Sequence, residues 1–397
     1  TTIAEKTIIN NFSLIYKIEG SDKSLLPACF LAHQDVVPAP PEGWENDPFS
    51  GIIKDGYVYG RGSMDMKSQF ITVMEAVETL LANNTLPKRT IYLCFGHDEE
   101  YPTLAGAPKI VEYFEKNGTR FEFVIDEGGL MLDGRLLGVD GTIALIGTCE
   151  KGHCDYTVRA DIDGGHGSMP GNKSSLGEVM KASVKIMKRP LPSQWTSATE
   201  DMIDSLAPHT KFGFRVVFAN RKLLAPLIKL VLDKASSITR SIVKTSFAPT
   251  MAKGSDAPNV IPGTASVNIN VRNIPGQSLD YIKAYMQKIA GKNVKIIADS
   301  AGSDASPISP IDTYAFSELK KAIGQTFEGL IVAPFMFPAG TDSKYYYPVC
   351  DNVFRFTPFI YGEDDRTRVH ARNERCKVAD LAKAAQFFGA LITNTCY

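Results

Sequence analysis

Five short stretches of the chain place histidine or carboxylate residues directly beside apolar runs of strand type. They span residues 32–38, 59–67, 96–100, 124–129 and 369–374, and read AHQDVVP, YGRGSMDMK, GHDEE, VIDEGG and VHARNE. Imidazole nitrogen and carboxylate oxygen are both ligands that zinc accepts. None of the stretches contains a cysteine, and sulfur-free sites with spare coordination positions are typical of catalysis. A lone histidine in a polar loop is usually only hydrogen-bonded, so the stretches predict a metal centre only as a set.

The first part of the chain has the pattern of an α/β domain. Apolar runs at 25–31, 90–95 and 121–125 predict strands, and helical periodicity at 68–81 and 107–116 predicts helices. Strands that alternate with helices favour a mainly parallel, doubly wound sheet. In such sheets a buried strand often ends at a functional loop, which is where the polar stretches lie.

The middle of the chain has a different pattern. Alternating runs at 154–160 and 265–271 predict strands, and helical periodicity predicts a helix at 177–187. The α/β character returns after a linker at 303–309, with helices expected at 314–326 and 378–393. The sequence therefore predicts an α/β fold whose main domain comprises residues 1–152 and 303–397, with an α+β domain inserted at 153–302.

Length and composition limit the class of protein. The 397 residues favour two domains, and a formal net charge of −1 gives no electrostatic argument for nucleic acid or an anionic membrane as partner. No apolar run approaches the ~18 residues of a membrane helix. The seven cysteines show neither zinc-finger nor redox spacing. Matches to the N-glycosylation pattern at Asn11, Asn83, Asn117 and Asn172 favour a secretory route, with an extracellular, vacuolar or lysosomal destination.

The five stretches resemble, in order and type, the motifs of the dizinc aminoacylase/carboxypeptidase metallopeptidases. This family includes aminoacylase, acetylornithine deacetylase, succinyl-diaminopimelate desuccinylase and carboxypeptidase S. Further matching segments lie at 164–170, 259–262, 271–276 and 340–343, so the resemblance covers nearly the whole chain. Residues 36–44, the GHDEE run and the long middle segment are most similar to the carboxypeptidase S branch, which includes the animal N-fatty-acyl-amino-acid synthase/hydrolase.

The resemblance implies a ligand set for two zinc ions, with cobalt or manganese as substitutes. The implied ligands are His33, Asp65, Glu100, Asp126 and His370. Asp65 would bridge the ions, with His33 and Asp126 on one and Glu100 and His370 on the other. Asp35 would fix the tautomer of His33, as groups behind metal ligands commonly do. A cis peptide bond is implied between Asp65 and Met66.

Catalytic roles are also implied by the resemblance. Glu99 would act as the general base, taking a proton from water and returning it to the leaving amine. His166, in the inserted domain, would cross to the site of a partner subunit and stabilise the oxyanion, so that the inserted domain would serve as lid and dimerisation domain of a homodimer. The plain alternatives are an ordinary acidic loop for Glu99 and a turn histidine for His166.

The expected substrate carries a free carboxylate. Arg272 and Asn259 would bind the carboxylate and carbonyl region, and the loop at Gly340 and Thr341 would lie against the carboxylate. These assignments imply hydrolysis, or formation, of the amide bond of an N-acyl, above all N-fatty-acyl, amino acid. The alternatives are a carboxypeptidase on short peptides and a binding protein without activity.

Two segments bear on substrate choice. The bulky residues 101–104 replace a small, glycine-rich stretch of the similar proteins, and this change would reshape the mouth of the site. The apolar segment 212–243 would either line a groove for an acyl chain or simply pack within the lid or at a dimer contact.

Overall fold

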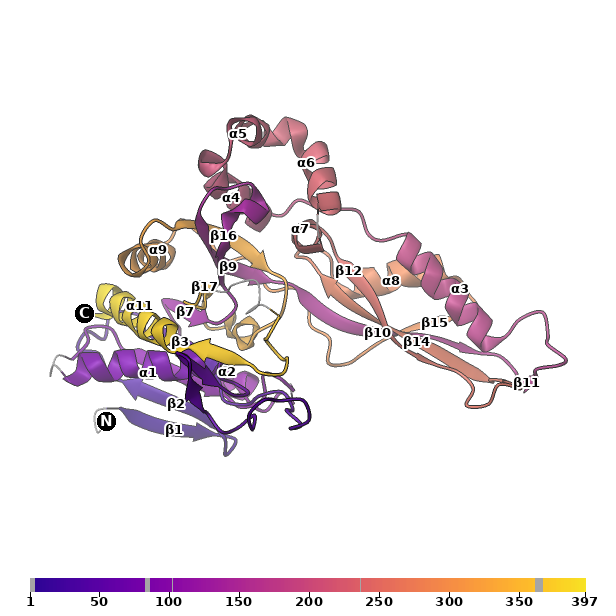
Figure 1. Ribbon diagram of the computed structural model, residues 1–397, viewed down its shortest axis with the longest axis horizontal. Coiled ribbons are helices and arrows are strands. Elements are labelled where there is room, and N and C mark those ends of the chain that lie inside the picture. The colour runs from indigo at the N-terminus through magenta and orange to yellow at the C-terminus, as the bar shows by residue number, and fades with distance from the viewer. Residues whose placement is uncertain (1–3, 83–85, 102, 236, 361–366) are drawn as a thin grey trace.

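The computed structural model describes residues 4–82, 86–101, 103–235, 237–360 and 367–397. A large part built around a mixed sheet holds both termini, and a long lid projects from it (Figure 1). The sheet has the strand order β1-β2-β6-β3-β7-β17-β9-β16, and β8 pairs with β9 beside this path. Its strands are β1 (Glu5–Ile9), β2 (Ser13–Ile18), β3 (Ala28–His33), β6 (Ile91–Gly96), β7 (Phe123–Asp126), β8 (Leu130–Asp133), β9 (Thr142–Glu150), β16 (Ile331–Phe337) and β17 (Val353–Arg355).

Parallel pairings lie at the centre of this sheet, and a further one joins the edge strand β16 to β9. β3 pairs in parallel with both β6 and β7, and β17 pairs in parallel with β7. The edge strands β1 and β2 are antiparallel, and β8 and β17 are antiparallel to β9. The α/β prediction is therefore confirmed, with a parallel core inside a mixed sheet.

Helices cover both faces of the sheet. One apolar cluster joins the sheet to helices α1 (Lys67–Ala82), α9 (Tyr314–Thr326) and α11 (Val378–Cys396). A second cluster contains the alternate side chains of the strands, together with α2 (Ala107–Lys116) and the 3-10 turn η3 (Asp342–Tyr346). Phe30 and Phe95 face the first cluster, whereas their neighbours Cys29 and Cys94 face the second. This alternation is the expected consequence of the period of two along a strand. The helices predicted at 107–116 and 314–326 have these bounds in the structure.

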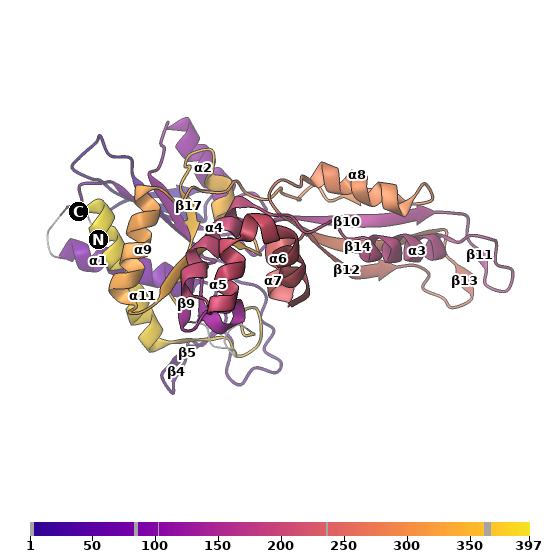
Figure 2. The same ribbon diagram turned by 90° about the horizontal axis from the view of Figure 1, so that it is seen from above.

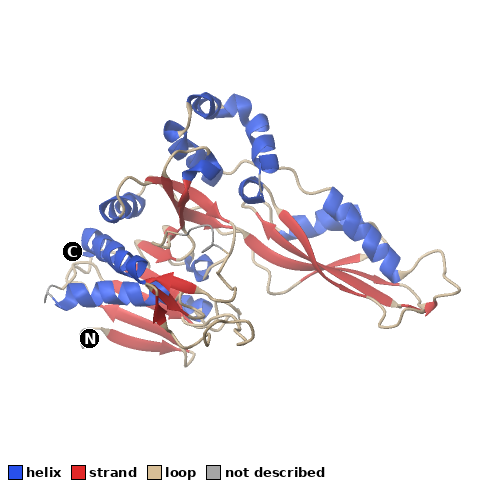
Figure 3. Ribbon diagram, viewed as in Figure 1, coloured by secondary structure: helices blue, strands red, loops and turns tan. Residues whose placement is uncertain are grey.

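The lid is an antiparallel four-stranded sheet with helices on one face (Figure 3). Its elements are β10 (Gly152–Asp161), β12 (Ser246–Lys253), β14 (Thr264–Asn273), β15 (Lys295–Ala298), α3 (Ser175–Lys188) and α8 (Leu279–Ala290). Alternate residues of β10 and β14, including Tyr156 and Ile269, pack against these helices. The tip of the lid carries the short pair β11 (Gly165–His166) and β13 (Val260–Ile261).

The remaining helices return to the large sheet. They are α4 (Ser197–Leu206), η2 (Ala207–His209), α5 (Phe212–Ala219), α6 (Arg221–Ala235) and α7 (Ser237–Val243). Met202 and Ile228 pack in one cluster with Ile143 and Phe335 of the large sheet. Part of the segment expected in the inserted domain thus packs on the main sheet, and the domain limits stay a prediction. Two short elements complete the large part: η1 (Gly134–Leu137) and a small sheet of β4 (Ile53–Lys54), β5 (Tyr57–Tyr59) and β18 (Arg375–Lys377).

Candidate metal centre

The acidic and histidine side chains gather at the carboxyl ends of the central parallel strands. His33 is the last residue of β3, Glu99 and Glu100 follow β6, and Glu127 follows β7. Because β6 and β7 flank β3 in parallel, their carboxyl ends lie side by side. This topology brings together residues that are almost a hundred positions apart in the chain.

Asp65 lies at the centre of this group, in the loop before α1. Its Oδ1 is 3.1 Å from Nε2 of His33, and its Oδ2 is 3.1 Å from Nε2 of His370. The two oxygens therefore face different histidines, as a carboxylate that bridges two ions must. The peptide bond between Asp65 and Met66 is cis, as the family resemblance implies.

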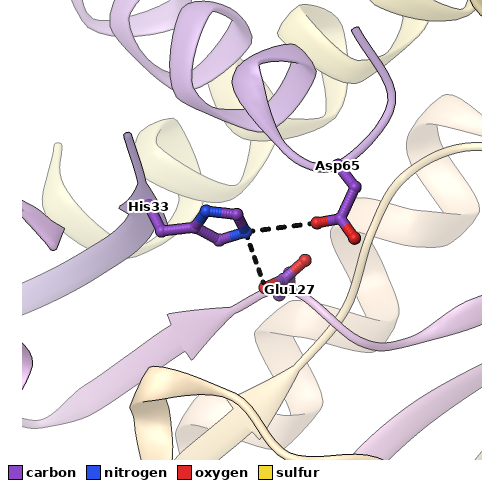
Figure 4. A group of neighbouring side chains, drawn as sticks. All are labelled: His33, Asp65 and Glu127. Carbon is purple, nitrogen blue, oxygen red and sulfur yellow. Dashed lines mark hydrogen bonds and ion pairs between the residues drawn. The ribbon is translucent and has the colours of Figure 1, made fainter. Parts of the chain in front are cut away.

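Two sets of three ligand atoms share this aspartate. His33, Asp65 and Glu127 form the first set, and Nε2 of His33 lies 3.4 Å from Oε1 of Glu127 (Figure 4). Asp65, Glu100 and His370 form the second, with 3.1 Å between Nε2 of His370 and Oε2 of Glu100. Three protein ligands leave a position open for water or substrate, which is the coordination typical of catalytic zinc.

The electrostatics of the group fit bound cations. Burial, followed by the charge of Asp65, raises the pKa of Glu127 to about 8 and also raises the pKa of Glu100. In addition, Oε1 of Glu100 is buried, and among the described residues no hydrogen-bond donor reaches it. The carboxylates of this group are crowded and one of their oxygens has no partner, so the negative charge is not fully balanced by the protein. Divalent ions held by the two ligand sets would balance it.

Asp126 does not occupy the expected place among the ligands. Its Oδ1 accepts the backbone N–H of Glu127 at 2.8 Å, and its Oδ2 accepts the backbone N–H of Ser343 at 2.8 Å. Both oxygens are therefore engaged away from His33, and Glu127 lies where the family resemblance implies Asp126. Adjacent residues at a strand end point to opposite sides, so only one of the two carboxylates can face the centre.

Asp35 positions two parts of the site. Its carboxylate accepts the backbone N–H groups of Glu99 at 3.2 Å and Glu100 at 3.0 Å, and its Oδ1 lies 3.5 Å from Nδ1 of His33. Burial raises the pKa of Asp35, but the hydrogen bond and charge of His33 outweigh it and lower the pKa overall. Asp35 thus orients both the histidine and the acidic loop, a broader role than the tautomer control expected from the sequence.

Glu374 is a positioning residue to which sequence reasoning gave no role. It is fully buried, and its Oε1 accepts the backbone N–H groups of Met64 at 2.8 Å and Asp65 at 3.1 Å. Its Oε2 pairs with Nη1 of Arg61, and Nη2 of Arg61 donates to the carbonyl of His370 at 3.1 Å. This network fixes the Asp65 loop relative to the His370 loop. The signal in the sequence was that Arg61 and Glu374 each lie in one of the five polar stretches, although nothing there pairs them.

Glu99 lines the cavity beside the two ligand sets. Burial, followed by the charge of Glu127, raises the pKa of Glu99 well above its ordinary value in the metal-free protein. Because Glu100 belongs to the second ligand set, Glu99 is the carboxylate of this loop that remains available for proton transfer.

A cavity of about 620 Å³ opens over the centre and has a cationic side. Arg272 lines it as expected, and so do Lys151 and Lys344, which sequence reasoning missed. Burial, followed by the charge of Arg272, lowers the pKa of Lys151 to about 7. Gly340 and Thr341 also line the cavity, where Oγ1 of Thr341 donates to the buried carboxylate of Glu150 at 2.9 Å. A buried lysine and a half-buried arginine in one wall form a site suited to an anionic group.

His166 and Asn259 lie outside this cavity. Both belong to the exposed lid tip, where the backbone N–H of Gly167 donates to the carbonyl of Asn259 at 2.7 Å. Figure 1 shows this tip at the end of the lid remote from the large part. Within one chain the structure therefore brings neither residue to the metal centre.

The two segments expected to affect substrate choice differ in position. Leu104 lines the cavity and Tyr101 is exposed, whereas residue 102 lies outside the described part of the chain. Among the described residues, none from 212–243 lines the cavity. The inward side of that segment packs against the large sheet instead, so the structure shows neither an acyl groove nor packing within the lid.

Comparison with known proteins places the chain in a family. Residues 29–394 match the model of peptidase family M20/M25/M40. The chain is 34% identical over 397 residues to N-fatty-acyl-amino acid synthase/hydrolase PM20D1 of Xenopus tropicalis, which covers 100% of this chain and 77% of that protein. It is 35% identical over 392 residues to probable carboxypeptidase S-like 2 of Dictyostelium discoideum, which covers 98% of this chain and 75% of that protein.

A solved structure shares the fold. The M20 family metallo-carboxypeptidase Sso-CP2 of Sulfolobus solfataricus aligns with a TM-score of 0.71 at 17% identity, over 98% of this chain and 89% of that one. The family match, the relatives above 30% identity and the paired ligand sets agree with one another. This chain therefore belongs to peptidase family M20/M25/M40 and is a metallohydrolase of amide or peptide bonds.

Proposed function

We propose that this protein hydrolyses the amide bond of N-acyl amino acids with long acyl chains, using two zinc ions held by the two ligand sets. The observation that carries the proposal is the composition of one cavity. Three kinds of surface occur among its lining residues: the carboxylates of Asp65, Glu99 and Glu127, the cationic groups of Arg272, Lys151 and Lys344, and several apolar side chains. A substrate with a free carboxylate, an amide and an apolar chain matches these three surfaces.

The apolar part of the cavity supports an acyl chain. It is lined by Met64, Leu104, Phe337, Ala339 and Val369. Two of the relatives reported above bear on substrate class, since one is named as acting on N-fatty-acyl amino acids and the other as carboxypeptidase S-like. We favour the acyl substrate because these apolar side chains line the same cavity as the carboxylates and the cationic groups.

The residues of this chain divide the chemistry among them. Bound metal ions would lower the pKa of a water molecule and polarise the scissile carbonyl. Glu99 would take a proton from the attacking water and deliver it to the leaving nitrogen. Arg272 and Lys151 would hold the carboxylate and so align the amide with Glu99. The same arrangement catalyses the reverse condensation when the acid and the amine are abundant.

Replacing Glu99 by glutamine tests the proton-transfer role. The variant should keep both metal ions, because all ligand residues remain, and should lose about 100- to 10,000-fold in turnover. Metal content and turnover are measured on the same preparation. Turnover near that of the unaltered protein would refute the role of Glu99.

A substrate panel separates the acyl proposal from its alternative. N-acetyl, N-oleoyl and dipeptide forms of the same amino acids are offered to the zinc-loaded protein, with a chelated sample as control. Chelator-sensitive cleavage that favours the N-oleoyl forms supports the proposal. A preference for dipeptides would assign the protein as a carboxypeptidase, for which the carboxypeptidase S-like relative is the present argument.

A homodimer accounts for the position of the lid tip. We propose that His166 and Asn259 reach the cavity of a partner subunit, because within one chain both lie at the exposed tip. Strand β12 forms an open edge of the lid sheet, and most of its residues are exposed, so it offers backbone groups for pairing with a second copy. Sedimentation of the protein and rescue of a His166→Ala variant by mixing with a Glu99→Gln variant test this arrangement.

A secretory destination remains part of the proposal. The asparagines at 11, 117 and 172 are exposed, as glycosylation requires, and residues 83–85 lie outside the described part of the chain. Treatment of protein from its native source with a glycosidase would reveal attached glycans by a loss of mass.

A further inference from the structure

Helices α5 and α6 present an apolar surface to solvent. We define the α5–α6 face by its outward side chains, which are Phe212, Phe214 and Val216 of α5 and Leu223, Leu227, Leu230 and Val231 of α6. Their exposed fractions range from 45% for Val216 to 80% for Phe212 and Leu223. Figure 2 shows both helices at the surface, with no other segment lying over them from this side.

Helix α6 is apolar on both sides. Leu224, Ile228 and Leu232 point inward and join the cluster on the large sheet. Leu223, Leu227 and Leu230 follow the same helical spacing on the outer side and remain exposed. A surface helix of a soluble domain normally carries polar residues on its outer side, so an apolar outer side indicates a binding surface.

The inner side of this helix pair leads to the substrate cavity. The cluster that buries Ile228 also includes Phe337, and Phe337 lines the cavity over the metal centre. The α5–α6 face and the cavity are therefore connected through a continuous set of packed side chains.

The same segment concentrates positive charge. Residues 211–244 contain eight lysines or arginines and a single acidic residue, Asp233, although the whole chain has a net charge of −1. Arg221 and Lys244 form ion pairs with aspartates. Lys222 and Lys234 are exposed at either end of the outer side of α6, and no carboxylate of the described residues lies within ion-pair distance of them.

Charge decides among the occupants of this face. A second copy of the chain would meet the face with the same face in a two-fold interface, and would set positive charge against positive charge. An anionic lipid surface instead offers phosphate and carboxylate groups to the lysines and acyl chains to the leucines and phenylalanines. Among the described residues, moreover, no helix is long and apolar enough to cross a bilayer.

We propose that the α5–α6 face docks on the surface of an anionic phospholipid bilayer. The inference goes beyond the proposed function and holds whichever amide the metal centre cleaves. Docking would keep the enzyme at a surface in which amphiphilic molecules are concentrated, with the cavity close to the docked helices.

Vesicle sedimentation tests the proposal. The full chain is mixed with vesicles of pure phosphatidylcholine, or with vesicles in which a third of the lipid is phosphatidylserine. We expect binding to the second kind, weakening as salt is raised, because screening reduces attraction between exposed charges. Each lysine near an anionic surface raises the binding affinity about fivefold, the equivalent of about 1 kcal/mol. Replacing Lys211, Lys222 and Lys234 together by glutamate should therefore weaken vesicle binding at least ~100-fold.

A second variant tests the apolar contribution. Replacing Leu223, Leu227 and Leu230 together by serine should weaken vesicle binding at least ~10-fold, since buried methylene groups supply the rest of the affinity. The matched control replaces Met180, Val184 and Met187 by serine, three exposed apolar residues of lid helix α3, and should bind as the unaltered protein does. Circular dichroism and thermal unfolding confirm that each variant is folded.

Three outcomes would overturn the proposal. These are failure of the unaltered protein to bind the phosphatidylserine vesicles, equal binding to both kinds of vesicle, and full binding by the leucine variant. If gel filtration shows a dimer that the leucine variant abolishes and no vesicles are bound, the α5–α6 face belongs to a second copy of the chain.

Discussion

Replacing Glu127 by glutamine, and separately Asp126 by asparagine, tests which of two adjacent carboxylates holds a metal ion. Oε1 of Glu127 lies 3.4 Å from Nε2 of His33, whereas the oxygens of Asp126 each accept a backbone N–H at 2.8 Å. We expect Glu127→Gln to retain one ion per chain, because the second ligand set is left whole. Asp126→Asn should retain both ions.

The two substitutions should change different quantities: Glu127→Gln lowers metal affinity, and Asp126→Asn lowers the free energy of unfolding. Changing a residue that merely supports a metal ligand typically lowers metal affinity ~10–100-fold, so removing the charge of Glu127 itself should lower it by more than about 100-fold at that position. Asparagine at position 126 keeps one acceptor but turns an NH₂ donor toward the other N–H. The loss of that charged hydrogen bond should cost about 1.5–3 kcal/mol of unfolding free energy.

Stability without metal should change differently in the two variants, because burial raises the pKa of both carboxyl groups but only Asp126 accepts two backbone N–H groups, which asparagine does not satisfy. Burial, followed by the charge of Asp65, raises the pKa of Glu127 to about 8. The buried side chain therefore holds a proton that the unfolded chain releases, and the folded state loses stability as the pH rises toward 8. Glutamine removes this cost, so metal-free Glu127→Gln should be at least as stable as the unaltered metal-free protein, whereas Asp126→Asn should be less stable.

Two measurements decide the matter. Metal content per chain is determined by mass spectrometry after zinc loading and dialysis, and unfolding by urea is followed in the presence of a chelator. If Asp126→Asn loses an ion while Glu127→Gln keeps two and binds them as tightly, the reasoning from hydrogen bonds is refuted.

Three further predictions concern the cavity wall, the metal ions and the buried ion pair. Burial, followed by the charge of Arg272, lowers the pKa of Lys151 to about 7, so its positive charge is present below that pH. The KM for a carboxylate substrate should therefore rise as the pH passes above about 7. In Lys151→Met, KM should be high at every pH and should lose this dependence. Chelation should lower the melting temperature as well as abolish activity, because ions at 1,000 times their Kd stabilise by about 4 kcal/mol; an unchanged melting temperature would contradict metal binding by the folded state. Glu374→Gln should cost about 3–5 kcal/mol in urea unfolding, because it leaves the charge of Arg61 buried without its partner. Adding Arg61→Met to this variant should recover part of that loss, since glutamine still accepts the backbone N–H groups of Met64 and Asp65.

The metal centre was largely predictable from the sequence. Four of the five expected ligands, His33, Asp65, Glu100 and His370, converge in the structure. For His33 and Glu100 the reason is topological, because the carboxyl ends of neighbouring parallel strands share one edge of a sheet. A polar residue directly after a buried strand is thus placed near the others before any side-chain contact is known. The structure places Glu127 rather than the predicted Asp126 beside His33 and Asp65, because sequence alone does not show which of two consecutive side chains faces the centre.

Long-range pairing was beyond the sequence. Arg61 and Glu374 are 313 positions apart, and their contact depends on how β5 pairs with β18. Lys151 and Arg272 line the same cavity because β10 pairs with β14. This register places His153 opposite Arg272, and Lys151 lies two positions before His153. Such neighbours become visible only when strand register is known.

The sequence by itself determined the residue types of the metal centre and the α/β order of the elements that carry them. Only the tertiary structure decided which side of each element is covered. The apolar segment 212–243 shows this most clearly, since its composition is compatible with helix packing within the lid, a dimer contact or an acyl groove. Ile228 is buried and Leu223 is exposed on the same helix because the large sheet covers one side only. Hydrophobicity specifies that a side chain gains by leaving water, but the packing of distant strands determines whether it does.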